Sequence, residues 1–98
     1  MSGGRYRLSQ SGRVSDQLRA VFARGAAEGA SRVTAQAAKW MIEELERTPA
    51  EFGESRDFLA HAELQSRIAF VPPIYVRFAI HEPTRTVFVG RIGWTKRG

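Results

Sequence analysis

The sequence has no cysteine and only two histidines, His61 and His81. Without thiols there is no disulfide framework, no thiol nucleophile and no cysteine-based zinc site. The two imidazoles fall on different predicted elements with no carboxylate cluster beside either, so neither a metal nor another cofactor is expected. These absences exclude disulfide-rich secreted scaffolds and argue against metal catalysis.

Long apolar runs are also missing. No run approaches the roughly 18 residues that a membrane helix needs, and residues 1–5 lack the apolar segment of a signal peptide. With 98 residues, the chain can bury one thin core between two layers of secondary structure. We therefore expect a single cytoplasmic domain over residues 1–98, with no membrane among its partners.

Lysine is scarce, because Lys39 and Lys96 are the lysines among 15 basic residues and the other 13 are arginine. The net charge of +5 is distributed unevenly, with +3 in residues 1–13, −2 in residues 14–54 and +4 in residues 55–98. Guanidinium groups bind phosphate oxygens in pairs and stack on bases, which suits a polyanionic partner. Codon usage in a GC-rich genome explains the arginine excess equally well, so composition leaves both explanations open.

Apolar spacing predicts one short strand and two helices in the first half of the chain. Polar and apolar residues alternate over residues 5–9, which favours a strand. Helical spacing then runs from Val14 to about Gly29, and again from Ser31 until Pro49 stops it. The apolar stripe of the second helix is predicted to be Val33, Ala37, Trp40, Met41 and Leu45.

The second half of the chain changes to the period of two that is typical of strands. Strands are predicted over residues 65–71, 74–81 and 86–92, with turns at Pro72-Pro73 and at residues 82–85, while residues 56–63 show no clear pattern. The expected fold class is α+β, in the order β-α-α-β-β-β. A helical hairpin would pack on one face of a small antiparallel sheet.

The strand over residues 74–81 predicts what the sheet presents on its other face. If its aliphatic residues face the helices, Tyr75, Arg77 and His81 face outward. Arg67 and Arg91 are expected to join them from the neighbouring strands, the latter depending on the turn register. Aromatic rings among guanidinium groups form a physically sound platform for RNA. An ordinary solvated sheet face remains the alternative.

The last eight residues carry three further basic groups and a tryptophan. Trp94, Lys96 and Arg97 could clamp a ligand beside the sheet. The alternative is a frayed terminus, which is the commoner fate of final residues.

Several segments resemble the RelE/ParE superfamily, the toxins of type II toxin–antitoxin systems, also described as plasmid stabilisation proteins. Residues 76–82 (VRFAIHE), the VFV of residues 87–89 and Ile92-Gly93 are similar to the two terminal strands of that family. The connector with Thr48-Pro49 and Phe52-Gly53 is similar to the family's proline and FG connector. The resemblance covers nearly the whole chain, and its motifs bear on the fold more than on catalysis.

For the ribonuclease branch, the resemblance implies a toxin that cleaves messenger RNA in the ribosomal A site, with a 2′-hydroxyl attacking the adjacent phosphate. Such an endoribonuclease needs a base, cations around the phosphate and an acid for the leaving oxygen. The residues implied for catalysis are Arg67, Arg77, His81 and Arg91. Those implied for RNA binding are Tyr75, Trp94, Lys96 and Arg97.

The resemblance also implies partners. A cognate antitoxin would bind the toxin through apolar anchors, for which Val21, Phe22, Trp40 and Met41 are candidates, although all four could belong to the core. The target would be the ribosome with its messenger RNA, or DNA gyrase if the chain belongs to the ParE branch. A protein-binding relative without nuclease activity, whether a gyrase inhibitor or a non-toxic member, is the alternative.

Overall fold

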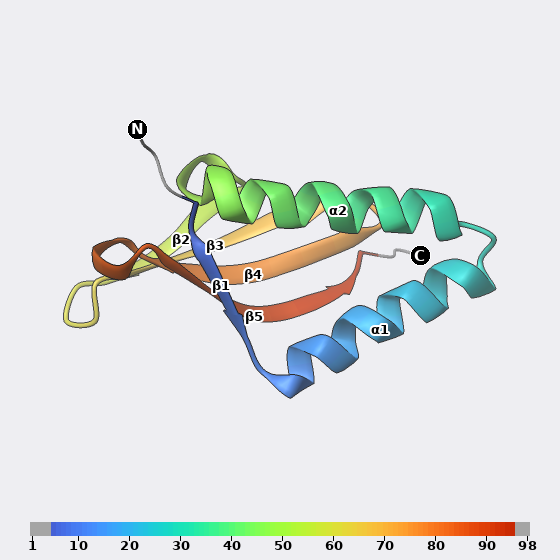
Figure 1. The fold of residues 1–98 in the computed structure, drawn as a ribbon, viewed down its shortest axis with the longest axis horizontal. Helices are drawn as coiled ribbons and strands as arrows, with labels where there is room; N and C mark the ends of the chain where they lie inside the picture. Colours follow the sequence, from blue (N-terminus) through green and yellow to red (C-terminus); the bar gives the residue numbers. More distant parts are fainter. Residues whose placement is uncertain (1–4, 96–98) are drawn as a thin grey trace.

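The computed structural model describes residues 5–95 (Figure 1) and contains two helices packed on a five-stranded mixed sheet. Both helices cover the same face of the sheet, whose strand order is β1-β5-β4-β3-β2. The elements are β1 (Arg7–Gln10), α1 (Gly12–Ala27), α2 (Ser31–Arg47), the 3-10 turn η1 (Pro49–Glu51), β2 (Glu54–Leu59), β3 (Leu64–Val71), β4 (Ile74–His81), the 3-10 turn η2 (Glu82–Thr84) and β5 (Thr86–Trp94).

Local sequence signals set the ends of the helices. Ser11 caps α1 by accepting a hydrogen bond from the backbone N–H of Val14, which satisfies a donor that the first turn leaves free. Gly29 follows α1 with a φ of 70°, a left-handed conformation that glycine adopts without steric cost. Thr48 caps the end of α2, and Pro49 then begins η1. Both predicted helices are therefore present, and their predicted bounds agree with the observed ones to within two residues.

The two helices approach closely where Gly25 meets Thr34. A Cβ atom at Gly25 would lie within 3 Å of the Thr34 side chain, so glycine permits this contact. The predicted stripe of α2 is wrong at two positions, because Val33 and Trp40 are 53% and 49% exposed. Thr34 and Ala38 are the buried residues at these turns of α2 instead, and Thr34 packs against Gly25 of α1. Among residues 5–95, neither helix has the length and apolarity needed to cross a membrane.

The sheet differs from the predicted one in two respects. It has a fifth strand, β2, which the sequence pattern does not reveal because all six of its residues are exposed. It is also not purely antiparallel, because β1 pairs in parallel with β5. A parallel neighbour needs a long connection, and here residues 11–85, with the helical hairpin and the strands β2 to β4, separate β1 from β5.

The core lies between the helices and the inner face of the sheet. On β4, Ile74, Val76, Phe78 and Ile80 are all at most 3% exposed, which confirms the predicted alternation. Buried residues of the other elements that join them are Val14, Val21, Ala37, Ala38, Met41, Leu45, Phe52, Ala69, Val87, Val89 and Ile92. The opposite face of the sheet has no covering layer in the described chain, so its side chains are available for binding (Figure 1).

Candidate functional site

An irregularity in the pairing of β4 with β5 creates the centre of the outer face. Phe78 pairs with Val89, but the preceding residue, Arg77, pairs with Arg91, so β5 contains one extra residue at this point. Gly90 and Arg91 are both exposed, which interrupts the alternation of β5. Without this bulge, Arg91 would point toward the helices. The bulge therefore brings two arginines directly opposite each other on the outer face.

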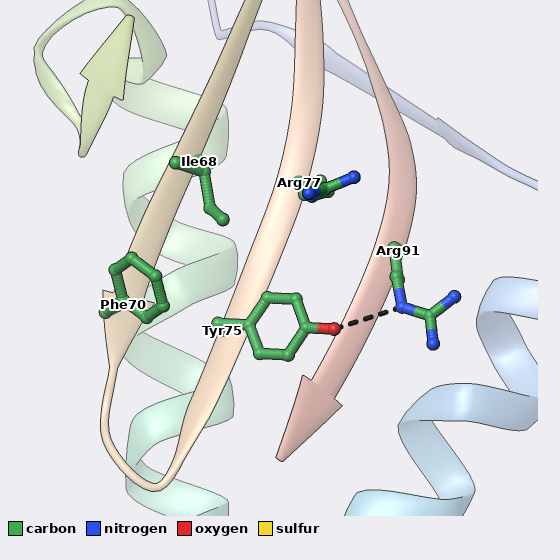
Figure 2. A pocket seen from close by; sticks show the side chains of 5 residues that line it. All are labelled: Ile68, Phe70, Tyr75, Arg77 and Arg91. Atoms are coloured by element: carbon green, nitrogen blue, oxygen red, sulfur yellow. Dashed lines mark hydrogen bonds between the residues drawn. The ribbon is translucent and has the colours of Figure 1, made fainter. Parts of the chain in front are cut away.

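Tyr75 lies across the sheet toward the same point. It pairs with Gly93 of β5, and a Cβ atom at Gly93 would lie 2.5 Å from Cε1 of the tyrosine ring. The absence of a side chain at Gly93 thus allows the ring to lie over β5. Its hydroxyl accepts a hydrogen bond from Nε of Arg91 at 3.0 Å (Figure 2). One side chain therefore links two strands, because the Tyr75 ring comes from β4 and its hydroxyl is bonded to the Arg91 guanidinium on β5.

These side chains line an open hollow of about 420 Å³ on the outer face (Figure 2). In this view α2 lies behind β3 and β4. The floor is apolar at Ile68, which is 8% exposed, and Phe70 is 60% exposed beside Tyr75, with 6.1 Å between the two ring centroids. The lining residues are Ile68, Phe70, Tyr75, Arg77 and Arg91.

The electrostatics of the hollow are one-sided. Within residues 5–95, no carboxylate lies within ion-pair distance of Arg77 or Arg91, and the side chain of Arg77 makes no hydrogen bond. Like charges directly opposite each other across two strands destabilise the sheet. An anion seated between the two guanidinium groups would remove this repulsion. The hollow is therefore suited to a phosphate with an aromatic or base-like group beside it.

The predicted outer-face position of Arg67 is wrong. Arg67 pairs with Phe78, a core residue, so its side chain lies on the helix side of β3 and is 8% exposed. It donates hydrogen bonds to the carbonyl oxygens of Phe52 and Gly53, at 3.0 and 2.8 Å. Arg67 ties the connector after α2 to the sheet and is not available as a cation on the outer surface.

His81 lies on β4 but away from the arginine pair. It is four residues beyond Arg77, which corresponds to roughly 13 Å along a strand. Its Nδ1 lies 2.7 Å from the hydroxyl of Thr84, in the turn between β4 and β5. The structure therefore does not bring together the predicted proton carrier and the predicted phosphate cations.

Trp94 is placed on the other side of the sheet from Tyr75. It pairs with the buried Ile74 and packs against the core, and the guanidinium of Arg24 in α1 lies 5.3 Å from its ring centroid. The predicted clamp beside the outer face is therefore wrong for Trp94, whose ring helps to seat α1. Lys96 and Arg97 lie outside the described residues.

Several residues of the outer face, among them Phe70, Phe88 and Arg56, were not predicted from the sequence. Phe70 lines the main hollow, Phe88 lines a second hollow of about 240 Å³, and Arg56 lines a third of about 170 Å³. Arg77 lines all three, so they form one surface around it. Pairing of β3 with β4 would have predicted Phe70, because it lies opposite the outward-facing Tyr75. Arg56 carried no such signal because β2 has no apolar period.

The second tyrosine has a separate structural role at the edge of the fold. The hydroxyl of Tyr6 donates to the carboxylate of Glu82, with O–O distances of 2.8 and 2.9 Å, and Arg85 lies over its ring. Burial raises the pKa of Tyr6, and the hydrogen bond to Glu82 raises it further. These contacts attach the residue before β1 to the turn between β4 and β5.

Comparisons with protein-family models, with curated proteins and with solved structures find no match for this chain. The site therefore has to be interpreted from its own chemistry.

Proposed function

We propose that the outer face of the sheet binds single-stranded RNA, with Arg77 and Arg91 on a phosphate and Tyr75 and Phe70 stacking on bases. Single-stranded RNA presents unstacked bases next to a charged backbone, and proteins bind it by combining aromatic platforms with cations. The hollow offers both within one lining. Its open shape suits a chain that enters and leaves at either side.

The observation that carries the proposal is the unneutralised arginine pair. If this face served only to keep the protein in solution, a carboxylate opposite Arg77 would make the sheet more stable. The bulge at Gly90 places Arg91 there instead. The fold does not need the repulsion between these two arginines. Such a feature is expected at a binding site, where an anionic ligand neutralises the two charges.

The resemblance to RelE/ParE toxins extends this proposal to ribosome-bound messenger RNA as the ligand and to strand cleavage as the outcome. The lining of the main hollow offers cations at Arg77 and Arg91 and the hydroxyl of Tyr75, which lies 3.0 Å from Arg91 Nε. With Arg67 buried and His81 roughly 13 Å away along β4, the arrangement supports RNA binding better than it supports strand cleavage.

The test is the affinity of the purified protein for a labelled single-stranded RNA of mixed sequence, measured by fluorescence anisotropy across a salt series. The double variant Arg77→Gln/Arg91→Gln is expected to bind at least about tenfold more weakly, with a shallower salt dependence, because two phosphate contacts are lost. The matched control, Arg13→Gln/Arg32→Gln, removes the same charge from exposed positions on α1 and α2 and should bind like the wild type. Equal losses in both double variants would mean that only net charge matters and would overturn the proposed site.

The toxin class has its own test. Expression of the chain alone should arrest growth, and the arrest should be relieved by Arg77→Gln/Arg91→Gln. Cut messenger RNA would support the ribonuclease branch, whereas intact RNA with inhibited DNA supercoiling would support the gyrase alternative. Normal growth with the wild-type chain would count against a toxin. A cognate antitoxin remains part of this proposal, supported by Phe22 and Trp40, which are 38% and 49% exposed on the helices.

A further inference from the structure

A smaller hollow beside the arginine pair is lined by an acidic side chain as well as basic ones. It has a volume of about 170 Å³ and shares Arg77 with the main hollow. Arg67 also lines it, but its guanidinium is bonded to the carbonyl oxygens of Phe52 and Gly53. The other lining residues are Arg56, Asp57 and Ser66.

A second bulge places two oppositely charged neighbours in this hollow. Ser55 pairs with Arg67 and Asp57 pairs with Ser66, so Arg56 is an extra residue in β2. Consecutive residues of a regular strand point to opposite faces, and the bulge is what lets Arg56 and Asp57 line one hollow. Within the described chain, neither side chain makes a hydrogen bond or an ion pair, so a donor group and an acceptor group are both free.

The carboxylate of Asp57 is unfavourable on a surface that only binds phosphates. It would repel the RNA backbone next to Arg77, and a neutral residue would serve that function better. Asp57 is therefore expected to compensate by accepting hydrogen bonds from the ligand. The groups in RNA that donate in the plane of a base are its ring N–H and amino groups.

We infer that this hollow binds guanine, with Asp57 accepting from N1–H and the N2 amino group and Arg56 donating to O6. The inference rests on the proposed RNA binding and names the base that the site prefers. Guanine presents two adjacent donors followed by an acceptor on its Watson–Crick edge, which matches a carboxylate next to a guanidinium. Adenine, cytosine and uracil each present at most one donor group there, so they leave part of the pair unsatisfied.

The experiment compares single-stranded RNAs of one length that carry a single guanosine in an oligouridine background. Wild-type protein should prefer the guanosine strand to oligouridine by about 5- to 140-fold, the range expected for a good bidentate contact. Replacing guanosine by inosine removes the N2 amino group and should abolish most of the preference. Replacing it by 7-deazaguanosine leaves the Watson–Crick edge intact and should preserve the preference.

The variant Asp57→Asn separates base recognition from simple electrostatics. If Asp57 only repels phosphate, its neutralisation strengthens binding to every RNA. If it reads guanine, Asp57→Asn weakens binding to the guanosine strand while binding to oligouridine is unchanged or stronger. The matched control Glu63→Gln removes one carboxylate from the turn between β2 and β3, outside this hollow, and should leave the preference intact.

The outcomes distinguish guanine recognition by this hollow from RNA binding by the outer face. Wild-type protein that binds all strands with equal affinity would overturn guanine recognition and leave the RNA surface standing. Protein that binds none of them would overturn both. A preference that survives Asp57→Asn, or that is retained with inosine and lost with 7-deazaguanosine, would overturn the assignment of the Watson–Crick edge to this hollow.

Discussion

Arg67 and Arg77 lie on adjacent strands, almost side by side, but their side chains are on opposite faces of the sheet. Arg67 pairs with Phe78 on the helix side, where two backbone carbonyls accept its hydrogen bonds. Arg77 pairs with Ile68 on the outer side, where it faces another arginine and, within residues 5–95, makes no polar contact. On the helix side an arginine stabilises the fold, whereas on the outer face an arginine is available to bind a ligand.

This difference separates stability from binding. Every buried side-chain polar atom of the described residues has a hydrogen-bond partner, as Arg67 on the helix side illustrates. The outer face keeps unneutralised charge and exposed rings at some cost in stability. Substitutions on the two faces should therefore have effects of different kinds.

The largest effect on stability is expected from Arg67→Met. Methionine keeps much of the volume but leaves the carbonyl oxygens of Phe52 and Gly53 without their donor, which should lower the free energy of unfolding by about 2 to 4 kcal/mol. Urea denaturation measures this loss. The folded fraction should still bind RNA with wild-type affinity, and a specific loss of binding without loss of stability would place Arg67 in the site after all.

A smaller effect, divided between stability and binding, is expected from Gly93→Ala. The new Cβ would collide with the ring of Tyr75, so the ring must move away from Arg91, at a cost of about 1 kcal/mol in stability. RNA affinity should fall about fivefold as one stacking surface is displaced. Gly90→Ala is the control, because the nearest atom to its Cβ is the Arg77 carbonyl oxygen at 3.7 Å, an ordinary contact. Identical behaviour of both variants would contradict this role of Gly93.

Arg77→Gln should change stability in the direction opposite to Arg67→Met. Removal of one charge of the pair relieves repulsion, so the free energy of unfolding should stay the same or rise by up to about 1 kcal/mol. At the same time, the slope of log affinity against log salt should fall by about 0.7, the amount expected for one phosphate contact with a single strand. Thermal unfolding and salt titration measure the two quantities. If Arg77→Gln lowered the free energy of unfolding, the distinction between a stabilising helix side and a ligand-binding outer face would be wrong.

The two tyrosines provide the smallest and most local comparison. In a Tyr75→Phe background, Tyr6 is the only titrating phenol, and its pKa should lie above the ordinary value of about 10. Glu82→Gln should bring the midpoint down toward that value, as followed by ultraviolet absorbance. Because the folded-state pKa is raised, the associated stability is complete below the unfolded pKa of about 10 and is lost as pH rises through the folded value. A midpoint at or below about 10 would contradict the Tyr6–Glu82 contact.

Strand periodicity was sufficient to predict β4 and its two faces. The aliphatic residues of this strand alternate strictly, so burying them also fixed the outward direction of Tyr75 and Arg77. The same reasoning failed for β2, whose six residues are all exposed and follow no period. It also failed for Arg67, because a single arginine beside the apolar residues of β3 does not indicate which face it takes.

The sequence alone therefore determined the elements that depend on local periodicity and caps, namely both helices, the strands β1, β3, β4 and β5, and the turns at Pro72-Pro73 and residues 82–85. Tertiary structure decided the site. Two bulges shift strand register by one residue, and in a strand such a shift turns a side chain to the opposite face. One bulge brings Arg91 opposite Arg77, and the other brings Arg56 and Asp57 into one hollow. Register depends on pairing with a strand that is distant in sequence, so no local pattern contains it.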